Sequence, residues 1–378
     1  MLNRSDIKRM LSDLFRTELA RHQKDSLAVF DDEDHDLFAK MPKELLPAVW
    51  EKAAAIFNYN VRAFSSLDLL VDYAYASFLK NQQVVFLTSG STGTPKRCVH
   101  TVDMIWEEAR GVAPLFGGVK RIVSLVPANH LYGFSFTVAL PHVLQVPVIN
   151  LPAIPTQPWD TLLEDGDLVV GFPLFWNYWL RCANRFTKQV DVLSSTAPCK
   201  DETIQGLLDV GVHQFTEIYG ASETGAIGFR HIPHDMFEIL PFWQTDFSQE
   251  PFVKIKRNCM DNWIELPDRV KVQEDRYLYP ISRQDACVQV AGINVYPKHV
   301  EKVLSAHPAV KECRVRLMRP EEGERLKAFI VLTEGHTADE LGFIRTYLSQ
   351  QLTVHEVPKT FTFGEQLPVN DIGKDADW

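Results

Sequence analysis

The sequence is poor in cysteine, and its cysteines are not paired by spacing. Six cysteines are scattered through 378 residues, and none of them forms a CxxC pair. A chain of this size buries enough surface to fold without covalent cross-links. We therefore expect the free thiols of a cytoplasmic protein rather than a disulfide framework. The same scatter offers no spaced ligand set for zinc.

Positive charge is also scarce. Lys and Arg number 39 against 49 Asp and Glu, which gives a formal net charge of −10. This balance argues against nucleic acid or an anionic membrane as the main partner, although a local basic pocket is compatible with it. Charged residues (23%) and hydrophobic residues (46%) otherwise occur in the proportions of a soluble globular protein. Those proportions exclude a disordered, collagen-like or coiled-coil chain.

Long uninterrupted hydrophobic runs are missing. The longest apolar stretch, residues 131–155, is broken by His142, Gln145 and four prolines, whereas a membrane-spanning helix needs about 20 consecutive apolar residues. Five charged residues within the first thirteen leave no apolar core for a signal peptide. Apolar residues at helical spacing instead predict an amphipathic helix from Ser5 onward. We therefore expect no stable membrane insertion.

The chain does contain short β-rich runs that alternate with helical patterns. The runs are Val84–Thr88, Arg121–Val126, Val146–Asn150, Leu168–Gly171 and Glu217–Tyr219, and the helical patterns include Trp106–Val112 and Glu202–Val210. This alternation predicts an α/β domain with mainly parallel sheets, over residues 1–283. Ligands of such sheets bind beyond the carboxyl ends of the strands, so the segments that follow strands are the candidate sites.

The pattern changes beyond residue 283. Strands are predicted over residues 287–291, 310–318, 325–332 and 360–363, and helices over 296–306 and 338–348. The segment is about 90 residues long, which is within the usual size range of a domain. We therefore predict a small C-terminal α+β domain over residues 286–378.

The strongest motif follows the first β-rich run. After Val84–Thr88 come serines, threonines and glycines in a string that ends at Lys96. Glycines allow several backbone N–H groups to face one anion, the hydroxyls add donors, and the lysine supplies a mobile charge for polyphosphate. The spacing differs from that of a Walker loop, GxxxxGK[ST]. The alternative is an ordinary Ser/Thr/Gly turn with a solvated lysine.

A second motif lies in residues 217–225. A predicted strand enters a short turn that carries a hydroxyl, Ser222, and a carboxylate, Glu223. Mg²⁺ combines few protein oxygens with phosphate oxygens, and Glu223 suits that role, while Tyr219 could stack on a base. The alternative is a buried aromatic side chain beside a glutamate that caps the turn.

With these strings the sequence resembles the adenylate-forming superfamily, which includes acyl-CoA synthetases, luciferases and the adenylation domains of peptide synthetases. The resemblance extends from residue 84 to residue 374, with the motifs in the family's order. It implies an enzyme that uses ATP and Mg²⁺, with a large domain and a small domain on a hinge. The residues implied to hold the ATP phosphates are Thr88, Ser89, Gly90, Ser91, Thr92, Gly93 and Lys96, and those implied to hold the metal are Thr88 and Glu223.

Two further loops resemble family segments. Residues 127–134 are similar to the loop that borders the acyl pocket, and residues 193–198 to the segment beside adenine, although Ser195 and Thr196 stand where relatives often have glycine. The implied AMP contacts are Thr196, Ala197, Pro198, Tyr219, Gly220, Ser222 and Glu223. The implied acyl-pocket residues are His130, Tyr132, Phe134, Phe172, Tyr219 and Ala221. Core packing is the alternative for Tyr132 and Phe134.

The C-terminal matches concern the ribose, the hinge and the thiol. By resemblance, Asp268 binds the ribose hydroxyls and Arg283 contacts ribose or phosphate. Asp285 matches the hinge aspartate, and Gly292 belongs to a loop that enters the site for the thiol step. Three positions depart from the family pattern: Ser282, Ala286 and Gln289.

The resemblance also implies the reaction. Lys374, in a string similar to LPxTxxGK, is the implied catalytic lysine, assisted by Lys96 and His130. A carboxylate attacks the α-phosphate of ATP, pyrophosphate leaves, and a thiol then takes the acyl group from the acyl-adenylate. Cations and positioning supply the catalysis, because negative charge develops on phosphate. A rotation about Asp285 would exchange Lys374 for the Gly292 loop.

The acid and the acceptor are less constrained by the sequence. An aromatic cluster near the predicted pocket suits an aryl acid, although core packing explains it equally well. The short chain is similar to the AMP-ligases of aryl-polyene pigment synthesis, which implies a 4-hydroxybenzoate- or cinnamate-like acid and the phosphopantetheine of an acyl carrier protein. The alternatives are coenzyme A with an aryl or medium-chain acid, an adenylation-only enzyme, and a non-catalytic nucleotide-binding relative. A second subunit could complete the acyl pocket in a homodimer.

Overall fold

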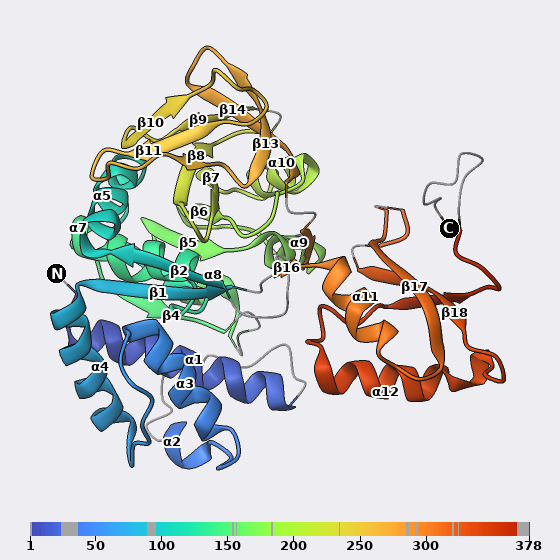
Figure 1. Ribbon diagram of the computed structural model, residues 1–378. Coiled ribbons are helices and arrows are strands. Elements are labelled where there is room, and N and C mark those ends of the chain that lie inside the picture. The colour runs from blue at the N-terminus through green and yellow to red at the C-terminus, as the bar shows by residue number, and fades with distance from the viewer. Residues whose placement is uncertain are drawn as a thin grey trace. The chain divides into compact units, whose positions relative to one another are not determined.

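The structure is a computed structural model, and its described part falls into two compact units (Figure 1). The residues that it describes are 2–23, 37–88, 96–152, 155, 157–182, 184–233, 235–284, 287–291, 293–319, 321–323, 325–368 and 378. The first unit comprises described residues up to Thr88 and from Arg97 to Ser282, and the second comprises Lys96 and the described residues from Arg283 onward. Each unit has its own core.

A nine-stranded sheet forms the centre of the first unit, with the strand order β13-β14-β9-β8-β7-β6-β5-β3-β4. Its strands are β3 (Arg121–Ser124), β4 (Val148–Asn150), β5 (Asp167–Gly171), β6 (Asp191–Ser194), β7 (Gln214–Ala221), β8 (Gly225–Arg230), β9 (Phe237–Ile239), β13 (Asp268–Gln273) and β14 (Tyr277–Arg283). Strands β4, β3, β5, β6 and β7 pair in parallel. The pairs β7–β8, β8–β9 and β9–β14 are antiparallel. The sheet is therefore mixed.

The parallel strands are buried on both faces. In β5, Leu168 and Val170 belong to one hydrophobic cluster while Val169 between them belongs to another. Successive side chains of a strand point to opposite faces, so the two clusters cover the two sides of the sheet. This explains why the sequence of these strands is a continuous apolar run rather than an alternation of polar and apolar residues.

Helices pack against this sheet through the two hydrophobic clusters. They are α5 (Val102–Val112), η1 (Ala113–Phe116), α6 (Leu131–Phe134), the π-helical turn η2 (Ser135–Ala139), α7 (Leu140–Leu144), α8 (Trp159–Leu162), α9 (Pro173–Arg181) and α10 (Asp201–Asp209). Trp176 and Trp179 of α9 pack with Ile204 of α10 in one cluster, whereas Val112 and Leu140 lie in the other. The two faces therefore have different helical covers.

One charged pair with a buried carboxylate lies at the start of the parallel strands. Arg121 of β3 stands directly opposite Asp167 of β5 in the register. Its Nε lies 2.8 Å from Oδ1 of Asp167 and its second terminal nitrogen 2.7 Å from Oδ2. Asp167 is 1% exposed, whereas the Arg121 side chain keeps 17% of its surface exposed, so the carboxylate of this bidentate pair is desolvated and the guanidinium is half-buried.

The N-terminal helices form a third cluster of the first unit, drawn in blue in Figure 1. They are α1 (Arg4–Gln23), α2 (Leu37–Lys40), α3 (Leu46–Phe57) and α4 (Leu67–Asn81), followed by the two-stranded sheet of β1 (Gln83–Thr88) and β2 (Lys96–Thr101). The apolar face that the sequence predicts for α1 is buried: Ile7, Leu11 and Phe15 have no exposed surface. A further small antiparallel sheet comprises β10 (Trp243–Asp246), β11 (Lys254–Arg257) and β12 (Ile264–Glu265).

The second unit has an α+β arrangement. Its elements are β15 (Val288–Val290), β16 (Ile293–Val295), α11 (Pro297–Ser305), β17 (Val310–Leu317), β18 (Leu326–Leu332), η3 (Ala338–Glu340), α12 (Leu341–Gln351) and β19 (Thr360–Phe363). Strand β18 pairs antiparallel with β17 and parallel with β19. Both long helices contribute to the core, α11 through Val300 and Leu304 and α12 through Ile344 and Leu348.

The predicted fold class is confirmed, with one qualification about strand direction. The first unit is an α/β body and the second a smaller α+β body, as the sequence indicates. Parallel pairing is confined to the β4–β7 half of the large sheet. In the part of the chain that the structure describes, no helix combines the length and the apolar character needed to cross a bilayer.

Candidate active site

The candidate site of the first unit lies where β6 and β7 end, as the rule for ligands of parallel sheets predicts. Two connections leave the sheet there. The loop after Ser194 leads to α10, and the turn after Ala221 leads to β8. Both contain residues that the sequence assigns to the nucleotide.

Tyr219 and Asp268, both predicted nucleotide contacts, lie side by side. The Tyr219 hydroxyl donates to Oδ2 of Asp268 over 2.7 Å. Tyr219 is half-buried in β7 with its ring centroid 5.5 Å from that of Phe237, and Asp268 is 7% exposed at the start of β13. The fold thus brings together two residues that are 49 positions apart, and the half-buried ring adjoins a carboxylate that can accept further hydrogen bonds.

The loop after β6 is held by hydrogen bonds to the neighbouring strand β7. Ser195 donates through Oγ to the carbonyl of Ile218 over 2.9 Å. The backbone N–H of Cys199 donates to Oε1 of Glu217 over 2.7 Å, and Oε2 of the same carboxylate accepts from Nε of Arg230 over 2.7 Å. Burial raises the pKa of Glu217, and the adjacent Arg230 guanidinium opposes that rise. Both ends of the loop are therefore attached to β7.

Thr196 in this loop has an unusual backbone. Its φ is +79°, a left-handed conformation that costs a residue with a Cβ roughly 1–2 kcal/mol relative to glycine. Thr196 is one of the two positions, with Ser195, where the resemblance to the family would lead us to expect glycine. Thr196 therefore adopts a backbone conformation that glycine takes more easily.

The turn between β7 and β8 has tight steric limits. A Cβ on Gly220 would collide with the carbonyl of Gly225, and one on Gly225, whose φ is +79°, would collide with the Glu108 carboxylate. The backbone N–H of Ala221 donates to Oγ1 of the fully buried Thr224 over 3.2 Å. Glu223 lies half-buried in this turn.

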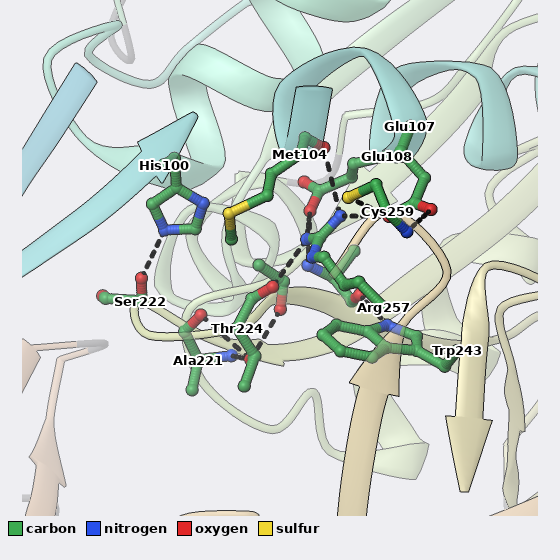
Figure 2. A network of polar contacts seen from close by, with 12 residues as sticks. His100, Met104, Glu107, Glu108, Ala221, Ser222, Thr224, Trp243, Arg257 and Cys259 are labelled. Carbon is green, nitrogen blue, oxygen red and sulfur yellow. Dashed lines mark hydrogen bonds and ion pairs between the residues drawn. The ribbon is translucent and has the colours of Figure 1, made fainter. Parts of the chain in front are cut away.

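A buried charged network supports the turn (Figure 2). The Arg257 side chain is fully buried, and one terminal nitrogen lies 2.6 Å from both Oε2 of Glu108 and the carbonyl of Thr224. Glu108 also accepts from the backbone N–H of Ala226 over 3.1 Å. The guanidinium carbon of Arg257 lies 4.7 Å from the Trp243 ring centroid. Helix α5 and strand β11 therefore hold the turn by charge-assisted hydrogen bonds.

This network is not predicted by the sequence motifs. Charged residues such as Glu108 and Arg257 ordinarily lie at the surface, and no motif marks them. One indirect signal exists, since Glu108 belongs to a helix whose apolar residues Met104, Ile105 and Val112 flank it on the buried face. Helical spacing places 104, 105, 108 and 112 together, which would predict a buried carboxylate.

Tyr132 joins the ends of two parallel strands. Its hydroxyl lies 2.9 Å from the carbonyl of Gly171 in β5 and 3.2 Å from that of Leu193 in β6. Burial raises the pKa of Tyr132 well above its ordinary value, so the hydroxyl keeps its hydrogen and donates. This predicted pocket residue therefore supports the sheet edge through its polar end.

The other predicted acyl-pocket residues differ in exposure. His130 is exposed just before α6, and Ala221 is half-buried at the end of β7. Phe172 is half-buried before α9. Phe134 has no exposed surface and its ring centroid lies 5.3 Å from that of Phe86, which supports the core alternative for this residue.

Several predicted site residues fall outside the described part of the chain. They are Ser89, Gly90, Ser91, Thr92, Gly93, Asp285, Gly292 and Lys374. Of the flanking positions, Thr88 ends β1 half-buried and Lys96 begins β2 exposed to solvent. Ala197 and Pro198 lie in the loop after β6, and Arg283 is the last residue of β14.

Comparison with known sequences decides the family. The family described as "AMP-binding enzyme" matches residues 2–243, and the one described as "AMP-binding enzyme C-terminal domain" matches residues 299–374. The chain belongs to the adenylate-forming, AMP-binding enzymes. The expected superfamily and the expected enzyme type, an AMP-forming acid–thiol ligase, are thereby confirmed.

Individual relatives of this AMP-binding enzyme include two curated bacterial proteins. A 4-coumarate–CoA ligase from Halorhodospira halophila is 34% identical over 293 residues, 77% of this chain and 74% of that protein. A 4-coumarate–CoA ligase from Rhodobacter capsulatus is 34% identical over 329 residues, 84% of this chain and 79% of that protein.

Solved structures support the same fold. The o-succinylbenzoate CoA synthetase from Bacillus subtilis matches with a TM-score of 0.63 and 20% identity, over 77% of this chain and 67% of that chain. A malonyl-CoA ligase matches with a TM-score of 0.62 and 19% identity, over 75% and 71%. At such identities the likeness concerns the fold of the adenylate-forming enzymes.

Proposed function

We propose that this enzyme converts an aromatic carboxylic acid of the hydroxycinnamate or hydroxybenzoate class into its acyl-adenylate and passes the acyl group to the thiol of coenzyme A. The observation that carries the proposal is the 34% identity to a 4-coumarate–CoA ligase over 84% of this chain. The resemblance of the sequence to the short AMP-ligases favours carrier-protein phosphopantetheine as acceptor. The relatives' names favour coenzyme A, which presents the same thiol.

The residues at the sheet edge fit an adenosine nucleotide. The half-buried Tyr219 ring offers a face for the base, and the Asp268 carboxylate, which accepts from Tyr219 over 2.7 Å, has further lone pairs for ribose hydroxyls. The positive φ of Thr196 brings the backbone of its loop into a conformation usual for glycine. These features support ATP as substrate.

Glu223 fits the magnesium ion that accompanies ATP. Its carboxylate is half-buried in a turn whose neighbour Gly225 has no room for a side chain. Mg²⁺ bound to a nucleotide takes one or two protein carboxylates and completes its shell with phosphate oxygens and water. A single well-placed glutamate is thus sufficient. Bound there, the ion would neutralise phosphate charge.

The proposed chemistry has two steps. A carboxylate oxygen of the acid attacks the α-phosphorus of ATP, and the bond to the bridging oxygen of pyrophosphate breaks. The thiolate sulfur then attacks the acyl carbonyl, and AMP leaves with the electron pair of the anhydride bond. In the first step Lys374 and Lys96 oppose the charge that develops on phosphate.

A pyrophosphate-release assay tests this function. We expect release to depend on the acid and to be fastest with 4-coumarate, cinnamate or 4-hydroxybenzoate, and a thioester to form with coenzyme A. Octanoate serves as the medium-chain comparison, and a phosphopantetheinylated carrier protein as the acceptor comparison. ATP binding without acid-dependent release would contradict the proposal in favour of a non-catalytic nucleotide-binding protein.

A further inference from the structure

His100 makes a contact that the proposed chemistry does not use. It lies in β2, the strand that begins at Lys96, and is 2% exposed. Its Nε2 is 2.7 Å from the backbone carbonyl of Ser222, on the turn that contains Glu223 (Figure 2). A carbonyl only accepts, so Nε2 carries the hydrogen and donates. Burial lowers the pKa of His100, so the ring is held as the neutral Nε2–H tautomer.

The surroundings keep the imidazole in this orientation. The ring packs edge-on against Phe86 of β1, with centroids 5.6 Å apart. The charged groups that act on it come from three other elements: Glu108 from α5, Arg257 from β11 and Glu223 from the turn itself. The donor is therefore fixed by both strands of the small sheet, β1 and β2.

Glu223 lies between two anchored carbonyls. On its N-terminal side the Ser222 carbonyl accepts from His100, and on its C-terminal side the Thr224 carbonyl accepts from Arg257 over 2.6 Å. The backbone on both sides of the carboxylate-bearing residue is held by buried donors. A carboxylate that must meet a metal ion needs such support, because loose ligands lose affinity.

We propose that His100 is a positioning residue for Glu223, and that it couples the strand beginning at Lys96 to the carboxylate that meets the magnesium ion of MgATP. The inference rests on the proposed role of Glu223. It predicts that loss of the Nε2 donor weakens the contribution of Mg²⁺ to nucleotide binding, while metal-free ATP binding is retained.

The test compares three substitutions in the full chain. His100→Leu removes the donor, His100→Gln places an amide N–H near the position of Nε2, and His100→Asn places one too short to reach Ser222. Calorimetry measures the dissociation constant of ATP with EDTA and with excess Mg²⁺. The constant with EDTA divided by the constant with Mg²⁺ reports how much the metal ion tightens nucleotide binding. We expect the ratio to fall roughly fivefold or more in the Leu and Asn variants and to return in the Gln variant.

Two outcomes would overturn the inference. One is an unchanged ratio in folded H100L or H100N, with only the melting temperature lowered, which indicates a structural role alone. The other is an unchanged ratio in Glu223→Gln, which removes the metal role of Glu223 and this inference with it. Acid-dependent pyrophosphate release by the unsubstituted protein would still stand in that case, so the reaction and the positioning role fail separately.

Discussion

The buried ion pair of Arg257 and Glu108 makes both residues sensitive to substitution. Arg257 also holds the Thr224 carbonyl, and Glu108 the N–H of Ala226, so each partner satisfies backbone groups as well as the opposite charge. Removing Arg257 leaves the buried Glu108 carboxylate without its cation, and removing Glu108 leaves Arg257 with only Glu107, 3.6 Å away. Breaking a buried pair in this way costs more than the pair itself contributes.

The first prediction concerns that pair. We expect Glu108→Gln to lower the free energy of unfolding by about 2 kcal/mol, because Arg257 loses its 2.6 Å charge-assisted hydrogen bond and keeps only the longer contact to Glu107, 3.6 Å away. Chemical denaturation followed by tryptophan fluorescence measures the loss. Asp103→Asn, an exposed position of the same helix, is the matched control and should change stability by less than about 0.5 kcal/mol. Equal losses in both variants would contradict the prediction.

A second prediction concerns pH. Because burial lowers the pKa of His100 in the folded chain, the unfolded chain, with its histidine pKa of about 6.5, takes up a proton more readily. The contribution of His100 to the free energy of unfolding is therefore complete above about pH 6.5 and decreases as the pH falls below that value. The free energy of unfolding, measured by denaturation at pH 7.5 and 5.5, should fall more in the wild type than in His100→Gln, by up to about 1 kcal/mol.

Single residues also show what the sequence can and cannot supply. Tyr219, Glu223 and Asp268 were predicted because their motifs stand in the family's order, and the structure places Tyr219 against Asp268. His100 and Arg257 were not predicted. They act on backbone carbonyls of a distant turn, and a contact of this kind leaves no spacing pattern in the chain.

Among the elements, helix α1 has a supporting role for the predicted pocket loop. Asp13 is 3% exposed and accepts the backbone N–H of Ala128 over 2.7 Å, two residues before His130. Burial raises the pKa of Asp13, and the Ala128 N–H together with Arg9 and Arg16 opposes that rise. The helix thus fixes the start of the 127–134 loop.

A third prediction follows for this helix. Asp13→Leu should raise the KM for the acid roughly fivefold, because the loop that borders the proposed acyl pocket loses its buried acceptor, while the KM for ATP stays unchanged. Asp13→Asn retains a side-chain oxygen for the Ala128 N–H and should keep the KM for the acid, although loss of the charge beside Arg16 lowers its stability. Steady-state pyrophosphate release gives both constants, and a parallel change in the two would refute the assignment.

Element positions were predicted better than strand directions. The run Leu168–Gly171 lies within β5 and the run Val84–Thr88 within β1, because continuous apolar residues mark strands buried on both faces. The antiparallel half of the large sheet was missed. A turn of only three residues separates β7 from β8, and so short a connection permits only antiparallel pairing.

On the scale of the whole molecule, the chain combines a large α/β unit with a small α+β unit. The order of motifs along the chain was sufficient to predict the family, and the family matches over residues 2–243 and 299–374 confirm that prediction. The motifs do not determine which acid or which thiol the enzyme uses, because the shape of a pocket depends on packing that motifs do not encode.

The fourth prediction concerns the two proposed half-reactions. Lys374→Ala should abolish acid-dependent pyrophosphate release, because the attack on phosphate loses a cation, yet it should still form thioester from a preformed acyl-adenylate. Lys359→Ala, an exposed lysine of the second unit, is the control and should support both half-reactions. Unchanged pyrophosphate release in the Lys374 variant would show that the assignment is wrong.

The Arg121–Asp167 pair has a consequence for how the parallel strands find their alignment. Both faces of β5 pack against hydrophobic clusters. A shift of its register by one residue would therefore exchange Leu168 and Val169 between two apolar environments and would bury no polar side chain of these two residues. Apolar burial alone therefore discriminates poorly between the two alignments. The slip would instead separate the buried Asp167 carboxylate from the Arg121 guanidinium, so this charged pair favours one alignment of β3 with β5 over its neighbours.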